Sequence, residues 1–288
     1  MKLAITTSNP DHILRILDTE TSQEFLLKTD PRGIDYRADK TRPPHRPYGI
    51  TWNKDHIFIA NRTNLLIYNS NLELVDVRQK LLDQNTHQIA IRGDQLIATR
   101  ATLNCIQYIN LEDYSSQFWH PKFGYLSDRP NLGACYHINS VLAEADDVYV
   151  MAHNQGKRTS QIVVGDSVTD TGYHMCHNIY LKDGVIGFVA TREKKVVIGE
   201  DIISNPFWEA YFLRGLAGDD KQLAVGCSDF NAKRKDRANG DGYVSIIKDK
   251  EVQKHCLLEE SGNICDIRRI DGPDFCHHNP HPFPLLQH

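Results

Sequence analysis

A short phrase recurs along the chain: a polar turn containing Asp or Gly, then a run rich in β-branched and aromatic residues. Alternation of apolar and polar residues is typical of β-strands, and helical periodicity is almost absent. The pattern therefore predicts an all-β chain built from repeated hairpins. Its clearest copies are "NKDHIFIAN", "RGDQLIATR", "EADDVYVMAHN", "LKDGVIGFVATR" and "GDDKQLAVGCS".

Each hairpin opens with an apolar strand and continues into third and fourth strands, so that a complete unit spans about 36–54 residues. Self-similarity at this spacing, with four short strands per unit, is typical of a β-propeller. The chain contains five complete units, whose first strands are expected at 48–52, 87–91, 137–142, 177–181 and 214–218.

The two ends of the chain contain complementary parts of a sixth unit. Residues 262–274 have the pattern of a first strand without its hairpin partner, and residues 2–28 have that of second, third and fourth strands. Pairing them closes a ring and leaves no open sheet edge. A β-sandwich also accommodates many strands but does not explain this complementarity. We therefore expect one six-bladed β-propeller domain over 1–275, followed by a Pro/His-rich tail, 276–288, that is mobile or lies on the surface.

Composition excludes several classes of partner. The net charge of −4 lacks the basic character typical of proteins that bind nucleic acid, and no apolar stretch is long enough to span a membrane. Seven cysteines without paired spacing indicate reduced thiols, and the first residues do not resemble a secretory signal. The expected partner is a small-molecule substrate rather than nucleic acid or membrane, and the expected location is cytoplasmic.

Three histidines begin first strands on consecutive predicted blades: His87, His137 and His177. The first strand of a blade lines the central channel, so these side chains are expected at one channel mouth. Three neutral imidazoles suit a divalent transition metal such as Zn, Fe, Mn or Cu. The alternative is that each histidine caps a loop by hydrogen bonding. Asn139 also competes with His137 for the position facing the channel.

Other polar residues are predicted to lie at the same mouth. Arg214 begins the next first strand, where its guanidinium would bind a carboxylate or phosphate of a substrate, or else form an ion pair with Asp266. Tyr48 and His153 are candidates for proton transfer. The expected substrate-binding residues are Arg100, Arg214, Asn139 and Asn263.

The segment "YHMCHN" resembles a local metal site, but its spacing argues otherwise. Cys176 and His177 are adjacent in a predicted strand, so their side chains face opposite sides and do not form a nucleophilic pair. His174 lies in the preceding loop as a possible outer residue of the site. A second loop, 229–242, is basic and is expected to be solvated or, alternatively, to form a lid.

Several phrases together resemble an uncharacterised family of bacterial conserved-hypothetical proteins. They are "RPYGITW", "HQIAIRGDQLIATRATLNCI", "FWHPKF", "YHINSVL", "CHN" and "FLRGLAGDDKQLAVGCS", within residues 46–274. The family counterparts read Arg-Pro-x-Gly, His-Asp, His-x-Asn-Gly, Pro-His-Ser and Phe-x-Arg-Gly-Leu. This chain departs from them at Gln88, Ser140, Cys176 and Asn178. The resemblance implies the fold and the site but no reaction, and the positions it matches are His87, Thr99, Arg100, Cys105, His137, Asn139, His177, Arg214 and Gly215.

Three functions are consistent with this pattern. The leading hypothesis is a metal-dependent lyase or hydrolase, in which the three histidines hold the metal and Arg214 binds the anion of a small substrate. The second is a propeller that binds a peptide, glycan or protein without chemistry. The third is a metal-free lyase or hydrolase in which His137 or His177 is the base.

Overall fold

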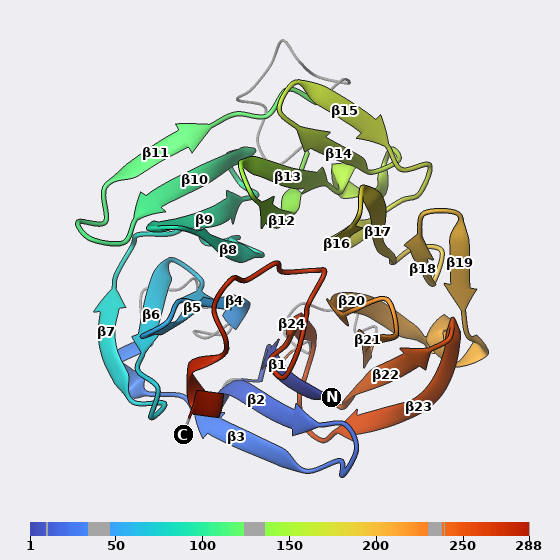
Figure 1. The fold of residues 1–288 in the computed structure, drawn as a ribbon, viewed down its shortest axis with the longest axis horizontal. Helices are drawn as coiled ribbons and strands as arrows, with labels where there is room; N and C mark the ends of the chain where they lie inside the picture. Colours follow the sequence, from blue (N-terminus) through green and yellow to red (C-terminus); the bar gives the residue numbers. More distant parts are fainter. Residues whose placement is uncertain (10, 34–46, 124–135, 230–237, 239, 288) are drawn as a thin grey trace.

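The computed structural model describes residues 1–288 apart from 10, 34–46, 124–135, 230–237, 239 and 288. Six four-stranded antiparallel sheets are arranged in a ring, which confirms the six-bladed β-propeller (Figure 1). Most of the predicted loop 229–242 lies outside the described residues. Helical structure in the described part is limited to short 3₁₀ turns such as Asn154–Gly156 and Pro206–Ala210, and none is long and apolar enough to cross a membrane.

Each blade contains four strands, and the blades are numbered 1 to 6 in the chain order of their innermost strands. The innermost strands are β4 (Pro47–Trp52), β8 (Ile89–Arg92), β12 (Ile138–Glu144), β16 (Cys176–Lys182), β20 (Tyr211–Gly218) and β24 (Ile264–Arg269). The second strands are β5 (Ile57–Asn61), β9 (Gln95–Arg100), β13 (Asp147–Ala152), β17 (Val185–Ala190), β21 (Gln222–Asp229) and β1 (Lys2–Thr7). The third strands are β6 (Asn64–Tyr68), β10 (Cys105–Asn110), β14 (Gln161–Val164), β18 (Lys195–Ile198), β22 (Gly242–Lys248) and β2 (His12–Asp18). The outer strands are β7 (Leu74–Arg78), β11 (Ser116–Trp119), β15 (Ser167–Asp170), β19 (Asp201–Ser204), β23 (Glu251–Leu258) and β3 (Glu24–Lys28).

Blade 6 is formed from both ends of the chain, as the sequence predicts. β24 pairs antiparallel with β1, with Ile5 opposite Ile267, and β2 and β3 continue the sheet outward. Apolar side chains from this blade and blade 5 pack into one buried cluster that includes Leu3, Ile5 and Ile264. The strongly apolar inner and second strands therefore bury their side chains between neighbouring blades.

The innermost strands carry an irregularity near their starts. Pairing shifts register between Ile138 and Ser140 in blade 3 and between His177 and Ile179 in blade 4. Each shift inserts one extra residue, as in a β-bulge, and re-aims the neighbouring side chains. The inserted residues are Asn139 and Asn178.

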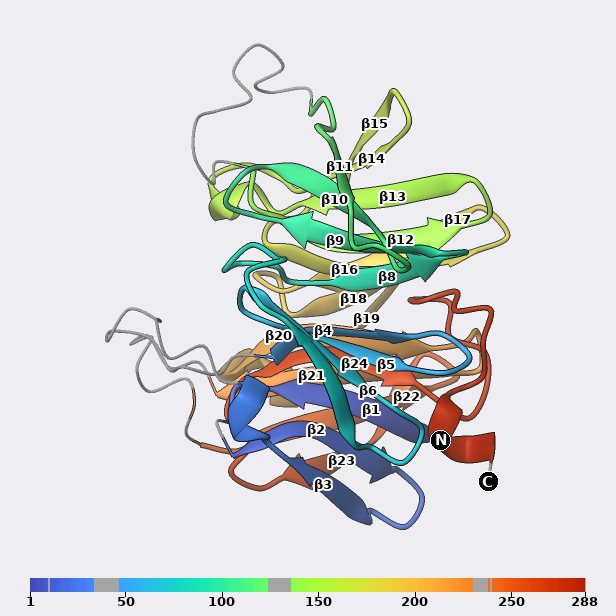
Figure 2. The same ribbon diagram turned by 90° about the vertical axis from the view of Figure 1, so that its left-hand side faces the viewer.

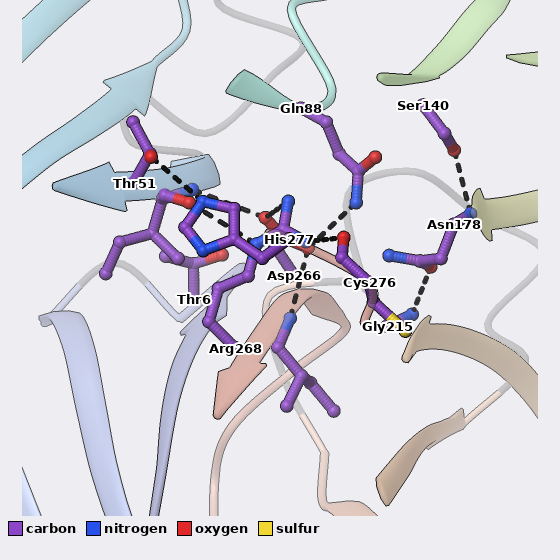
Figure 3. Close-up of polar contacts among 12 residues, drawn as sticks. Thr6, Thr51, Gln88, Ser140, Asn178, Gly215, Asp266, Arg268, Cys276 and His277 are labelled. Carbon is purple, nitrogen blue, oxygen red and sulfur yellow. Dashed lines mark hydrogen bonds and ion pairs between the residues drawn. The ribbon is translucent and has the colours of Figure 1, made fainter. Parts of the chain in front are cut away.

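A belt of side-chain hydrogen bonds links successive inner strands near the middle of the channel (Figure 3). Asp266 accepts hydrogen bonds from Gln88 Nε2 at 3.0 Å and from the Ile50 backbone N–H at 3.3 Å. The Gln88 amide oxygen in turn accepts from the Val141 N–H at 3.1 Å. One carboxylate therefore connects blade 6 to blades 1 and 2, and Gln88 extends the belt to blade 3.

Blades 3, 4 and 5 are connected in the same way. The Asn178 N–H donates to Ser140 Oγ at 2.8 Å, and the Gly215 N–H donates to Asn178 Oδ1 at 2.9 Å. Asn139 Nδ2 donates to the Cys176 carbonyl at 2.8 Å. The residues inserted at the bulges therefore supply the hydrogen bonds that tie neighbouring inner strands together.

The C-terminal tail crosses the ring at the ends of the inner strands (Figures 1 and 2). Cys276, His277 and Phe283 are buried, so the expectation of a mobile or surface tail is wrong for these residues. His277 Nε2 lies 2.9 Å from Thr51 Oγ1, and the Trp52 indole N–H donates to the His281 carbonyl at 2.8 Å. The tail is held because its side chains and carbonyl groups bond to and pack against the end of β4, where Thr51 and Trp52 are buried.

Gly215 provides a test of how closely blades 5 and 6 pack. Its φ is +84°, and an added Cβ would lie 2.7 Å from Ile267 Cγ1. Gly184 has a φ of +78° but no neighbouring atom within 4 Å of such a Cβ. We expect Gly184→Ala to cost about 1 kcal/mol from backbone strain, and Gly215→Ala to cost about 2–4 kcal/mol from strain plus overpacking.

Urea denaturation of both variants and the wild type measures this difference. Equal losses of unfolding free energy would show that the contact with Ile267 relaxes without cost.

Candidate functional site

Four imidazoles and two other aromatic rings form a continuous row where the inner strands begin. Successive ring centroids are separated by 4.8 Å, 4.8 Å, 4.8 Å, 5.2 Å and 5.6 Å. We call this set the histidine row, and its members in order are Tyr48, His87, His137, His153, His177 and Phe212. The row spans blades 1 to 5 and brings His87, His137 and His177, which the sequence placed at one channel mouth, together with His153.

His153 reaches the row because of the pairing within blade 3. Ile138 lies opposite Ala152, and the His153 N–H donates to the His137 carbonyl at 3.3 Å. The His153 ring consequently lies between those of His137 and His177. Within the strand register, the equivalent of His177 is Ile138 rather than His137, so the three first-strand histidines are not strictly equivalent.

Arg214 is a buried cation next to the row. It is 8 % exposed, its Nη2 donates to His87 Nδ1 at 2.7 Å, and its guanidinium carbon lies 5.4 Å from the centre of the Tyr48 ring. Within the described part of the chain it has no ion pair with a carboxylate. Asp266, the acidic partner that the sequence suggested, instead forms an ion pair with Arg268 at 3.0 Å.

Hydrogen-bond partners define opposite tautomers for His87 and His177. A guanidinium only donates, so His87 Nδ1 accepts from Arg214 and the neutral ring carries its proton on Nε2. A carbonyl only accepts, so His177 Nδ1, 2.9 Å from the Met175 oxygen, carries the proton of its ring. His177 Nε2 therefore holds a lone pair.

The environment keeps the central imidazoles neutral. Burial, together with the nearby His137 and Arg214, lowers the pKa of His153 to about 3. Burial also holds the pKa of His177 well below its usual value, with further lowering from His153 and Arg214. Arg214 therefore supplies the positive charge of the site at neutral pH, while His153 and His177 serve as uncharged donors or acceptors.

The predicted three-histidine metal site does not match this arrangement closely. The lone pair of His87 is engaged by Arg214, so in this tautomer the ring offers no nitrogen to a metal. Among the described residues, no group of three or more His, Cys, Asp or Glu side chains is arranged to hold a metal ion. Metal binding by His87, His137 and His177 stays a prediction.

The predicted substrate-binding residues are distributed over different surroundings. Asn139 is 1 % exposed and its amide bonds to the Cys176 carbonyl and Ser140 Oγ, so it belongs to the belt. The guanidinium carbon of Arg100 lies 5.2 Å from the centre of the Phe118 ring, toward the outer strand of blade 2. The Asn263 carbonyl accepts from the Ser8 backbone N–H at 2.8 Å, and the Asn263 N–H donates to Ser8 Oγ at 2.7 Å. In the ranges that the structure describes, none of these three has a contact with the histidine row that would define a role there.

The sequence singled out two residues near His177: Cys176, expected to face away from the site, and His174, expected at its outer edge. Cys176 is buried in the core of blades 3 and 4, and burial raises the pKa of its thiol to about 12, which rules out an active thiolate at neutral pH. His174 Nδ1 lies 3.0 Å from Glu193 Oε1, outside the row. Thr191 and Phe212, which contact the His177 ring, were not singled out from the sequence. A signal existed for both: Thr191 repeats the Ala-Thr-Arg of Thr99 at the end of a hairpin, and Phe212 opens the phrase "FLRGL".

Comparisons with known proteins support the fold and leave the activity open. No protein-family model matches the sequence, and a search of curated proteins found no match. A chain of a nidogen/laminin complex is similar in structure, with a TM-score of 0.62 and 8 % identity over 93 % of this chain and 97 % of that one. A protein of unknown function from Bacteroides caccae has a TM-score of 0.60 and 10 % identity over 94 % and 99 %. The chain is thus a six-bladed β-propeller similar to a bacterial protein of unknown function, and the resemblance to a particular family stays a prediction.

The low pKa of His153 makes the fold sensitive to acid. The unfolded histidine takes up a proton near 6.5, whereas the folded one does so only near 3, so stability falls as the pH drops through this interval. From this residue alone we expect a loss of about 2 kcal/mol between about pH 8 and pH 5. His153→Phe removes that proton uptake and gives a shallower pH dependence.

Urea denaturation across this pH range measures the effect. Thr99→Val, which removes a buried hydroxyl that does not titrate, is the control and is expected to keep the wild-type slope. Identical slopes for wild type and His153→Phe would contradict the assignment.

Proposed function

We propose that the histidine row and Arg214 form the active site of a lyase or hydrolase that acts on a small anionic substrate without requiring a metal. Arg214 binds the anion, and His177 is the general base. The observation that carries the proposal is the surroundings of Arg214: a buried cation whose hydrogen-bond partner is the imidazole of His87 rather than a carboxylate.

The burial of Arg214 favours an anionic ligand. A charge removed from water is costly unless it is paired, and neutral imidazole offers only a weak counterpart. A carboxylate or phosphate oxygen matches the fork of N–H groups on a guanidinium. Since His87 carries its proton on Nε2, it is a second donor that favours the same ligand.

The tautomer of His177 suits proton transfer. Its Nε2 lone pair can accept a proton from a carbon next to a carboxylate or from water. The low pKa of His177 also makes the imidazolium formed in this step a strong acid, which favours return of the proton to a leaving group. A base that becomes an acid within one turnover is what lyase and hydrolase chemistry require.

Ligand binding tests the role of Arg214. A panel of carboxylates, phosphomonoesters and their uncharged amide counterparts is screened by thermal shift, and hits are measured by calorimetry. We expect anions alone to stabilise the wild type, and Arg214→Gln to weaken binding by at least about 30-fold because a buried charged hydrogen bond is lost.

Arg192→Gln is the matched control. Arg192 is exposed and its Nη1 donates to the Gly156 carbonyl rather than to a ring of the row, so this variant is expected to bind like the wild type. Equal affinity of wild type and Arg214→Gln for every anion would overturn the proposal. Tight binding without turnover of any panel member would favour the non-catalytic alternative.

A metal-dependent enzyme is the second candidate, since two of the buried histidines, His153 and His177, are kept neutral as metal ligands must be. It predicts stoichiometric metal in untagged protein grown with Zn, Fe, Mn or Cu, and loss of that metal in His137→Ala. The metal-free proposal predicts anion affinities that a chelator leaves unchanged. Elemental analysis beside calorimetry, with and without chelator, separates the two.

A further inference from the structure

Thr191 forms a hydrogen-bonded bridge between the proposed base and the strand that carries Arg214. Its Oγ1 lies 2.8 Å from His177 Nδ1 and donates to the Leu213 carbonyl at 2.7 Å. Thr191 is 1 % exposed and directly follows β17 in blade 4. Its bonding partner Leu213 directly precedes Arg214 in β20 of blade 5. One hydroxyl thus joins two blades at the site.

The direction of the hydrogen bonds follows from the chemistry of the groups. A hydroxyl has one proton, and the Leu213 carbonyl receives it because a carbonyl cannot donate. The oxygen of Thr191 is therefore an acceptor for the N–H of His177. This acceptor and the Met175 carbonyl, at 2.9 Å, both favour the proton on Nδ1 and leave the lone pair on Nε2.

We infer that Thr191 is a positioning residue that, together with the Met175 carbonyl, holds the proton of His177 on Nδ1 and sets the orientation of its ring relative to Arg214. The inference rests on the proposed function for its catalytic consequence, but the tautomer of His177 is a physical property that is measured without a substrate. Partners that fix the remote nitrogen of a histidine commonly tune the other nitrogen in this way.

A second threonine shows what a merely structural role looks like. Thr99 is the last but one residue of β9, the second strand of blade 2, bonds to the backbone of His87, and is also fully buried. Its Oγ1 accepts from the backbone N–H groups of His87 and Gln88, at 3.0 Å and 3.1 Å, and donates to the Gln88 carbonyl. Thr99 therefore bonds backbone groups, whereas Thr191 bonds an imidazole ring.

The test is nitrogen NMR of protein labelled at histidine, with the His177 signals assigned through their loss in His177→Gln. In wild type we expect a single tautomer of His177 protonated on Nδ1. Thr191→Val removes one of the two acceptors, and because the Met175 carbonyl remains, we expect the tautomer protonated on Nε2 to appear beside the original one rather than to replace it. Thr191→Ser restores the hydroxyl and is expected to restore the single wild-type tautomer.

Thr99→Val is the control for general loss of stability. It removes an equally buried hydroxyl, so its melting temperature is expected to fall like that of Thr191→Val while the signals of His177 stay unchanged. A single wild-type tautomer in Thr191→Val, or failure of Thr191→Ser to restore it, would overturn the inference. Failure of the proposed function would instead appear as absent anion binding, which leaves the tautomer result standing.

Discussion

The ion pair between Asp266 and Arg268 at the centre of the ring is the contact on which the rest of the structure depends. Both side chains are completely buried, 3.0 Å apart, on the last inner strand of the chain. Asp266 also accepts hydrogen bonds from blades 1 and 2, and Arg268 Nη1 donates to the Cys276 carbonyl of the tail at 2.8 Å. Removing one partner of such a pair leaves a buried charge and typically costs about 3–5 kcal/mol. The pair therefore holds the ring, the belt and the tail in one arrangement.

The belt also determines where the site residues lie, because the two sets alternate along the chain. His87 is followed by Gln88, His177 by Asn178 and Arg214 by Gly215. In each pair the first residue belongs to the site and the second bonds to the inner strand of another blade. A rigid belt directly beside the site keeps buried polar groups in fixed positions, as recognition of a charged ligand requires.

The β-propeller ring was predictable from repeats within the sequence. Recurring hairpins and two complementary chain ends define six blades, and the first-strand starts identified His87, His137, His177 and Arg214. His153 was expected at the same mouth, but its place between His137 and His177 could not be predicted, because it depends on a one-residue bulge at Asn139 that has no clear sequence signal. The buried tail was missed for a different reason: it is rich in Pro and His, and its packing depends on Trp52, which lies far away in the sequence.

Closure of blade 6 has a consequence for the order of folding. β1 is synthesised before the other five blades, yet its inner neighbour β24 is made only after those blades are complete. At roughly 5–20 residues per second, the edge of β1 waits for tens of seconds during translation. Throughout that time the apolar strand lacks the partner that shields it. The nascent chain thus needs chaperone protection at this early strand as well as at its newest segment.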